Sequence, residues 1–355
     1  MSKAHEYNRK RARKRITQGV EFIRLAQRTI GADVCDGEWR EPDVELLKAF
    51  QRDECKLKGE DVDGMCGPTT ERFIRHKSGI MKGVAIEFWW DHGPIERVGA
   101  LKAAGVDGLS IMCNRSDKQG SKLPTWRREE SITDVAAAAK KRNMKVILTV
   151  WSRPDKWYID AVLSRLAELV KKTSADAIEF DLEGNWKDDD IRPGVGFDTL
   201  DEAGHYLAKQ IRKFRCRHGV AVELTTYPGH NQWQPDAIVA EECDALYYQI
   251  YTPAQTKRQR KEGEGKRRIW GGRDAPAVRQ RREIKKLRKA WPNKPPVCGL
   301  SCWGRTHPNV GPLDSLEVSL CEAALQGIKR VRYWSAKHCT DGEVTEFLTR
   351  VKQGL

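Results

Sequence analysis

The sequence lacks any apolar run that approaches the roughly 18 residues of a membrane-spanning helix. Its first fifteen residues, MSKAHEYNRKRARKR, are basic but lack the apolar stretch of a secretory signal. These absences predict a chain with no transmembrane segment that is made and kept in a cytosol. With 355 residues, of which 39% are hydrophobic, the chain fits one large packed domain and one small one.

Patterns typical of metal and dinucleotide sites are also missing. The ten cysteines form no close pairs at zinc-site spacing, and no His or Cys pair follows Cys298 and Cys302 at a suitable distance. No glycine-rich phosphate loop follows the first predicted strand. We therefore expect reduced cysteines, no metal and no cofactor.

Positive charge is in excess, because 64 Lys and Arg residues stand against 50 Asp and Glu residues, a net charge of +14. Such an excess calls for an anionic partner. Residues 1–15 are predicted to form a basic tail, and a second basic run spans residues 257–268. No recognisable nucleic-acid-binding module accompanies them. An anionic bacterial envelope fits the charge equally well, so we expect no specific nucleic-acid partner.

Residues 16–78 are predicted to form a small three-helix domain. Apolar residues recur at helical spacing in two segments, and Pro68 suits the first turn of a third helix. The following link, residues 78–82, is short, so the two domains should lie close together.

Residues 83–355 alternate between predicted strands and amphipathic helices. This pattern predicts a (β/α)8 barrel of the TIM type, and a doubly wound open sheet is the alternative. The predicted strands are Gly83–Trp90, Val106–Asn114, Lys145–Ser152, Ala177–Gly184, Ala221–Tyr227, Ala245–Tyr251, Pro296–Trp303 and Arg330–Ser335.

Three acids lie on one face of the fourth predicted strand, namely Glu179, Asp181 and Glu183. The opposite face is apolar and must pack under helices. Buried carboxylates are costly unless they are paired or functional, so this pattern indicates a catalytic site. Because close like charges raise the pKa of one partner, Glu183 is expected to act as a general acid, as glycosidic cleavage requires. The seventh strand carries no second acid, which argues against a two-carboxylate retaining mechanism.

Tryptophans fall at or just beyond several predicted strand ends. Each one alone is better explained as core, but together they favour a carbohydrate groove, since indole faces stack on sugars. The residues are Trp89, Trp151, Trp186, Trp233, Trp303 and Trp334.

The fourth strand, Asp176-Ala-Ile-Glu179-Phe-Asp181-Leu-Glu183, resembles the Asp-x-x-Asp-x-Asp-x-Glu signature of family 18 glycoside hydrolases, with Glu179 in place of the second Asp. The sixth strand is similar to the Gln-x-Tyr of hevamine-type members, and the last strand to their Trp-Ser-Lys segment. Family 25 lysozymes also carry an Asp-x-Glu at this position, so the choice between the two families stays open.

The resemblance to family 18 implies substrate-assisted hydrolysis. Glu183 would protonate the leaving oxygen, and Asp181 would hold the 2-acetamido group that attacks the anomeric carbon. Tyr251 would hydrogen-bond this group. The other expected substrate-binding residues are Glu179, Gln249, Trp334, Trp89, Trp186 and Tyr227.

The N-terminal domain resembles the peptidoglycan-binding domains of lysins. Phe50-Gln51 followed by Asp63-Gly64 and Gly67-Pro68-Thr69-Thr70 is similar to their pattern, and Asp36-Gly37 echoes it upstream. Together the two resemblances imply a phage endolysin, a bacteriolytic monomer that stays in the host cytoplasm until lysis and then hydrolyses the glycan backbone of peptidoglycan. The alternatives are a family 18 chitinase, a family 25-like muramidase and a catalytically dead carbohydrate-binding barrel.

Overall fold

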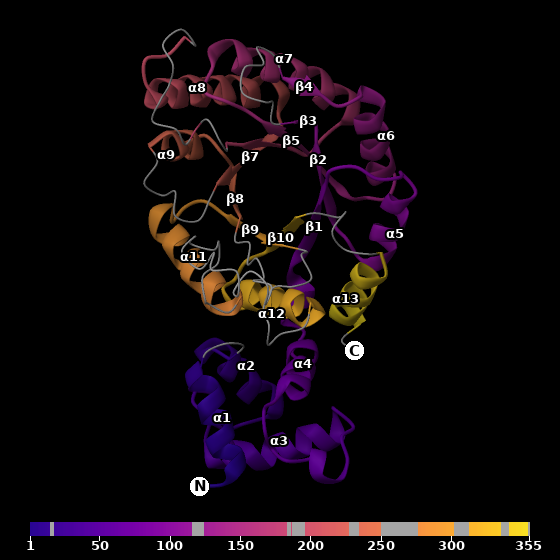
Figure 1. Ribbon diagram of the computed structural model, residues 1–355, viewed down its shortest axis with the longest axis vertical. Helices are drawn as coiled ribbons and strands as arrows, with labels where there is room; N and C mark the ends of the chain where they lie inside the picture. The colour runs from indigo at the N-terminus through magenta and orange to yellow at the C-terminus, as the bar shows by residue number, and fades with distance from the viewer. Residues whose placement is uncertain are drawn as a thin grey trace, which may run out of the picture.

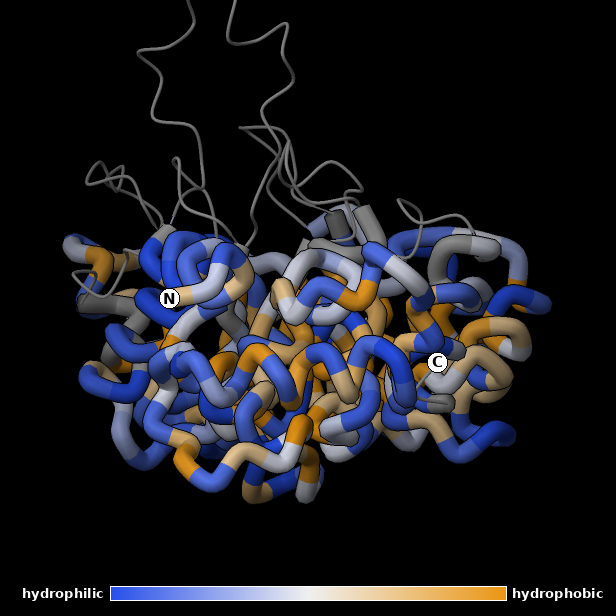
Figure 2. The backbone as a smooth tube through the Cα atoms, turned by 90° about the horizontal axis from the view of Figure 1, so that it is seen from below, coloured by the Kyte–Doolittle hydropathy of each residue, from blue (hydrophilic) through white to orange (hydrophobic). Residues whose placement is uncertain are grey.

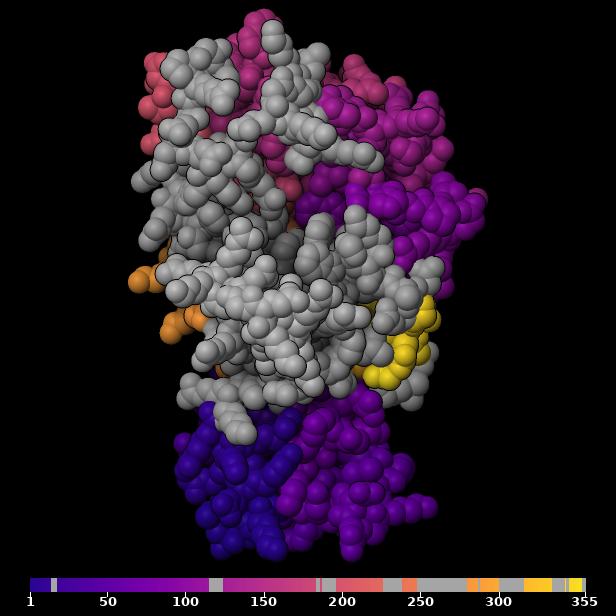
Figure 3. Space-filling model, viewed as in Figure 1, coloured from indigo at the N-terminus to yellow at the C-terminus, as the bar shows by residue number. Residues whose placement is uncertain are grey.

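The computed structural model describes residues 1–14, 18–115, 124–182, 186, 196–226, 234–249, 276–301, 312–334 and 341–353. A small lobe of helices lies at one end, and next to it a ring of strands is enclosed by helices (Figure 1). The space-filling view shows the N-terminal lobe as a distinct part of the surface (Figure 3). No helix within the described ranges is both long and apolar enough to cross a membrane.

Eight parallel strands close into a barrel in the order β1-β10-β9-β8-β7-β6-β5-β2. This arrangement confirms the predicted TIM-type barrel and excludes the open sheet. The strands are β1 (Ala85–Trp90), β2 (Gly108–Met112), β5 (Lys145–Trp151), β6 (Ala177–Asp181), β7 (Ala221–Thr226), β8 (Ala245–Gln249), β9 (Pro296–Ser301) and β10 (Arg330–Trp334). A short antiparallel pair, β3 (Asn114–Arg115) and β4 (Thr125–Trp126), follows β2.

Helices surround the barrel, and some of them begin at a residue whose side chain caps the first turn. Asp155 and Thr199, for example, accept the backbone N–H groups that open two of the longest helices. Apolar stretches of the chain lie mostly toward the interior and hydrophilic stretches toward the outside (Figure 2). The helices are α5 (Arg97–Ala104), α6 (Glu129–Lys140), α7 (Lys156–Thr173), α8 (Leu200–His218), α9 (Gln234–Glu241), α11 (Pro276–Ala290), α12 (Pro312–Leu325) and α13 (Asp341–Gln353).

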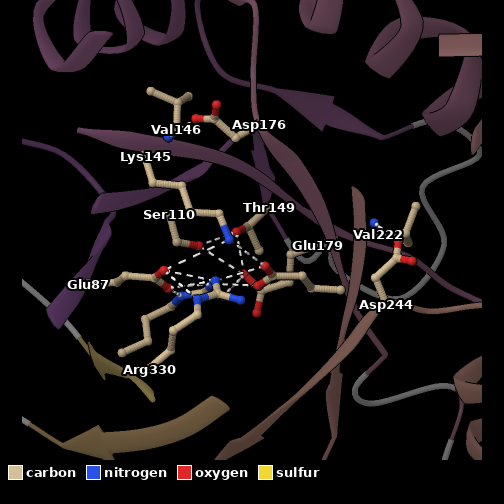
Figure 4. Close-up of polar contacts among 12 residues, drawn as sticks. Glu87, Ser110, Lys145, Val146, Thr149, Asp176, Glu179, Val222, Asp244 and Arg330 are labelled. Atoms are coloured by element: carbon tan, nitrogen blue, oxygen red, sulfur yellow. Dashed lines mark hydrogen bonds and ion pairs between the residues drawn. The ribbon is translucent and has the colours of Figure 1, made fainter. Parts of the chain in front are cut away.

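A repeated aspartate ties neighbouring strands together at the N-terminal end of the barrel. Asp107, Asp176 and Asp244 each stand just before a strand, and each carboxylate accepts the backbone N–H of a residue in the preceding strand. The three bonds come from Ile86 (2.8 Å), Val146 (2.7 Å) and Val222 (2.8 Å), and Figure 4 labels the last two pairs. Asp176, the first acid of the fourth-strand motif, therefore supports the barrel at the end opposite the C-terminal rim.

The N-terminal lobe contains the three α-helices predicted for residues 16–78 and a fourth, formed by the residues before them. They are α1 (Lys3–Lys14), α2 (Val20–Ile30), α3 (Glu41–Asp53) and α4 (Pro68–Lys77), with short 3-10 turns η1 (Gly59–Asp61) and η2 (Ile80–Gly83).

The predicted basic tail is corrected by the structure, because most of it forms helix α1 and packs on the lobe. Ala4 and Asn8 are buried on one face of α1. The Asn8 side chain donates to the carbonyl of Gly64 (3.0 Å) and accepts from the N–H of Cys66 (2.7 Å). Basic residues dominate the composition of this segment, so its sequence did not indicate that one face is buried against the lobe.

The lobe contains a structural repeat. Gln27 on α2 accepts from the N–H of Gly37 (2.9 Å) and donates to the carbonyl of Glu38 (2.9 Å). On α3, Gln51 accepts from the N–H of Gly64 (2.7 Å) and donates to the carbonyl of Met65 (3.1 Å). Each glutamine thus fixes one Asp-Gly turn, which explains why the Asp36-Gly37 sequence echoes Asp63-Gly64.

The lobe contacts the barrel through α12 and α13. Leu25 of α2 belongs to the same buried cluster as the barrel helices, and Leu325 of α12 packs against the core of the lobe. His76 on α4 lies 3.3 Å from the carboxylate of Glu317 on α12, which also lies 3.5 Å from Arg350. The short link thus places the two parts in contact, as the sequence predicted.

Candidate functional site

Strand β6 carries the acids that the sequence singled out. Its apolar residues Ile178 and Phe180, together with Leu182, lie in the core beneath the helices, as predicted. Alternation therefore directs Glu179 and Asp181 into the barrel. Asp181 is the last residue of β6 and pairs in register with Trp151 of β5 and Thr225 of β7. Its buried side chain thus lies at the C-terminal rim, where the reacting groups of such barrels are found.

Glu179 lies one layer deeper than Asp181 and is fully buried. One carboxylate oxygen, Oε2, accepts from the hydroxyls of Ser110 (2.9 Å) and Thr149 (2.8 Å) and from the guanidinium of Arg332. The other oxygen accepts from the hydroxyl of Thr225. Glu179 was expected to bind substrate, but its oxygens are already held by side chains from four other strands, and it exposes no surface.

Below Glu179, an ion network fills the barrel interior (Figure 4). Arg332 donates to Glu87 (2.8 Å) and Glu223 (2.6 Å) in addition to Glu179. Arg330 donates to the same two carboxylates, Glu87 and Glu223, each at 2.8 Å. Lys145 donates to Glu223 at 3.0 Å. Three carboxylates thus face three cations, which leaves this buried set formally neutral.

The network keeps its members charged. Burial alone lowers the pKa of Arg332, but the carboxylates of Glu179, Glu87 and Glu223 outweigh it and hold that pKa well above its ordinary value. Burial conversely raises the pKa of Glu223, and the three cations overcome it and lower that pKa to about 2. Such a buried set is stable only while each charge keeps its partners.

Sequence reasoning missed most of this network. Glu87, Glu223, Arg330 and Arg332 all fall at inward positions of predicted strands. The signal was present, because a charged residue in phase with Glu179 on another barrel strand must also point inward. Arg332 in particular lies two residues before Trp334, and the sequence prediction for this strand rested on that tryptophan and the residues after it.

Three of the six rim tryptophans belong to the core. Trp89 is 2% exposed and meets the ring of Tyr247 edge-on, with centroids 6.1 Å apart. Trp151 is buried and meets Tyr158 in the same manner at 5.7 Å. The indole N–H of Trp186 donates to the carbonyl of Ser152 at 2.9 Å, and this residue is fully buried. The protein itself thus encloses these indole rings. Substrate contact by Trp89 and Trp186 stays a prediction.

The remaining site predictions fall at or beyond the edge of the described structure. Gln249 and Trp334 are the last residues of β8 and β10, so their backbone lies at the same rim as Asp181. Their side chains lie outside the described part of the chain, as do Glu183, Tyr227, Tyr251, Trp233 and Trp303 in full.

Comparison with solved structures identifies the architecture. The C-terminal domain of a putative chitinase from Desulfitobacterium hafniense DCB-2 matches with a TM-score of 0.54 and 12% identity, over 77% of this chain and 99% of that one. The Group IV chitinase of Ostrinia furnacalis matches with a TM-score of 0.51 and 11% identity, over 76% and 100% of the two chains. The shared fold is the (β/α)8 barrel. A β-1,4-mannanase matches as well, with a TM-score of 0.50 and 12% identity over 77% of this chain and 97% of that one.

At these identities the likeness concerns the fold and leaves the substrate open. No family profile matches the sequence, and no curated protein sequence matches it. Across the described ranges, no group of three or more His, Cys, Asp or Glu side chains is arranged to hold a metal ion.

Proposed function

We propose that this chain is an endolysin that hydrolyses the glycan backbone of peptidoglycan, with Glu183 as general acid and Asp181 as the residue that orients the 2-acetamido group. The observation that carries the proposal is the placement of Asp181 at the C-terminal rim of a glycoside hydrolase-like barrel. Such an enzyme would remain in the host cytoplasm until lysis releases it to the wall.

The layer beneath Asp181 supports this chemistry. Glu179 lies two residues before Asp181 in the same strand and is held by Arg332 and three hydroxyls, so the layer beneath Asp181 is fixed in place. In the proposed mechanism, Asp181 stands on this fixed layer when it binds the acetamido group, and Glu183 continues the same inward-facing series by sequence.

A mechanism in which the acetamide of the substrate acts as the nucleophile, with retention of configuration at the anomeric carbon, fits the carboxylates that this chain provides. Two-carboxylate retaining enzymes need a separate nucleophile on the opposite side of the scissile bond. The seventh barrel strand, β9, supplies Val297, Gly299 and Ser301 at its inward positions and no acid. The acetamido oxygen of the sugar would take the place of that nucleophile.

We propose further that the N-terminal lobe binds the cell wall. Its two glutamine-fixed turns support this, because they reproduce in structure the repeated Asp-Gly pattern on which the resemblance to peptidoglycan-binding domains rests. The exposed basic residues of α1 add attraction to an anionic envelope.

The test is digestion of purified peptidoglycan and of chitin by the full-length protein, followed by identification of the new reducing-end sugar. We expect release from peptidoglycan that is lost in Glu183→Gln. Release from chitin alone would favour the family 18 chitinase alternative. Binding to either polymer with no release from both would support a carbohydrate-binding barrel and contradict the proposal.

A further inference from the structure

A cavity of about 230 Å³ opens beside the barrel wall, between strands β1 and β2 and helix α6. Trp90 and Ile111 are register partners at the ends of β1 and β2, and both line it. Their neighbours Trp89 and Ser110 belong to the barrel interior, so alternation turns Trp90 and Ile111 outward toward α6. The cavity is therefore separate from the barrel mouth.

The cavity combines an apolar floor with a polar wall. Trp90, Ile111, Ile132 and Val135 form the buried floor, while Ile95 is 39% exposed in the loop after β1. These side chains offer contact to small apolar groups such as methyls.

The polar wall includes Arg127, Asp91 and His92, and Ser131 and Asp134 of α6 also line the cavity. The guanidinium of Arg127 pairs with Asp91, and the imidazole of His92 lies 3.3 Å from the same carboxylate. The Nε atom of Arg127 is buried and has no hydrogen-bond partner among the described residues. A buried donor of this kind is costly unless a ligand acceptor reaches it. The wall thus suits a carbonyl or carboxylate oxygen.

The cavity lies on the same rim as Asp181. Asp181 pairs in register with Trp151, whose backbone N–H and carbonyl bond the side chain of Asn114 at 2.7 and 2.9 Å. The N–H of Arg127 donates to the carbonyl of Cys113, the residue before Asn114, at 2.9 Å. A continuous chain of contacts therefore joins the site strand to the cavity along the C-terminal rim.

We propose that this cavity receives the peptide branch of a peptidoglycan strand whose glycan backbone lies in the barrel mouth, an inference that rests on the proposed function. Muramic acid carries a lactyl group joined to alanine, which supplies two methyl groups and carbonyl acceptors in a short space. The volume is below the roughly 300–1,000 Å³ of sites that enclose a whole drug-sized ligand, so it fits a branch better than a sugar chain. Chitin has no branch and would leave it unfilled.

Binding is tested on the full-length protein with labelled isoleucine methyl groups, because Ile95, Ile111 and Ile132 all line the cavity. Muramyl dipeptide is expected to shift these three signals, while Ile284 on α11 and Ile178 on β6 serve as internal references. N,N′-diacetylchitobiose, which has the sugar but no branch, is expected to leave the three signals in place. Equal shifts with both probes would overturn the assignment to a branch.

A second experiment measures turnover. We compare kcat/KM on intact peptidoglycan with kcat/KM on the same glycan after an amidase has removed its peptides. The ratio of the two values is expected to fall about tenfold in Ile95→Asp, because this substitution removes one apolar contact at the cavity. Trp157→Asp is the control, because Trp157 is an apolar residue exposed at 77% on barrel helix α7 and does not line the cavity. Its ratio is expected to equal that of the wild type.

The two failures are distinguishable. Release of sugar from both substrates, with an unchanged ratio in Ile95→Asp and no isoleucine shifts, overturns the cavity's role and leaves the proposed function standing. No release from either substrate overturns the proposed function, and the assignment of the cavity to a branch of its substrate falls with it.

Discussion

Arg332 and Glu179 face each other inside the barrel, with the guanidinium of Arg332 donating to Glu179 one layer beneath Asp181. The pair joins the last strand of the barrel to the strand that carries the candidate catalytic acids. It therefore links the stability of the fold to the electrostatics of the site.

Arg332→Met is expected to destabilise the barrel strongly. The substitution keeps much of the side-chain volume but leaves three buried carboxylates against two cations, and breaking such a buried pair typically costs about 3–5 kcal/mol. Urea denaturation checks this value. The matched control is Arg212→Met, which breaks an exposed pair with Glu242 and is expected to change little. The double variant Arg332→Met with Glu179→Gln should recover part of the loss. An additive loss would show that the two residues do not interact.

Stability should also depend on pH through Glu223. The folded state lowers the pKa of Glu223 from 4.5 to about 2, so its contribution is fully present above the unfolded value and is lost as pH falls from 4.5 toward 2. A shift of this size corresponds to about 3 kcal/mol. Thermal unfolding between pH 7 and pH 2 measures it. Glu223→Gln should be less stable at pH 7 and should have a flatter acid limb, whereas a limb identical to that of the wild type would contradict the prediction.

The fold was predictable from sequence because its signals are local and repeated. Apolar residues alternate with charged ones in strands such as Ala177–Asp181, and helical spacing marks the segments between the strands. The ion network was less accessible, since a residue such as Arg332 is usually exposed in proteins and only the closed barrel shows which partners neutralise it. Helix α1 was also missed, because its buried Asn8 stands among basic residues that are typical of an exposed segment.

The candidate site was only partly predictable. Alternation correctly placed Asp181 at the rim and the apolar residues of β6 under the helices. It could not tell that Asp176 is a strand-bridging residue at the far end or that Glu179 is enclosed by its partners. Both roles depend on neighbouring strands that are distant in sequence.

Asp181→Asn and Glu183→Gln should both retain the fold and lose wall hydrolysis. Removing the general acid is expected to lower kcat by about 10²–10⁴-fold. Asp181→Asn should also lose activity, because the acetamido group loses the charge that orients it. Circular dichroism checks the fold, and release of reducing sugar from peptidoglycan checks the rate. Wild-type rates in Asp181→Asn would exclude a mechanism that uses the acetamide of the substrate.

The repeated turns of the lobe should respond alike to substitution. Gly37 and Gly64 have φ angles of 87° and 72°, and an added Cβ would lie 2.6 Å and 2.7 Å from the Cγ1 atoms of Val20 and Val44 respectively. Alanine at either position should therefore lower the free energy of unfolding, both by about 1–2 kcal/mol for the left-handed backbone and further through the clash. Gly31→Ala is the control, because φ there is 77° and nothing lies within 4 Å of the added Cβ. Equal losses of unfolding free energy at all three positions would contradict the close packing of the repeat.

Salt should weaken attack on whole walls more than attack on a short neutral oligosaccharide. The Debye length falls from about 10 Å at 0.1 M salt to about 3 Å at 1 M, so attraction between the basic protein and an anionic envelope is screened. Because α1 is part of the lobe, its deletion would disturb the fold, and replacing its exposed residues Arg9, Lys10 and Arg13 with Gln is the cleaner change. This triple variant should flatten the salt dependence on walls. Its rate on the oligosaccharide should match that of the wild type.

The control removes the same charge from the barrel. Lys171, Lys209 and Lys213 are exposed on α7 and α8, helices on the far side of the barrel from the lobe (Figure 1), and their replacement by Gln lowers the net charge equally. If adhesion resides on the lobe, this second triple variant keeps the steeper salt dependence of the wild type on walls. If both variants flatten the curve to the same degree, the wall responds to the total charge of the protein and α1 has no special part in attachment. The comparison of the two slopes therefore separates a local binding surface from a general electrostatic attraction.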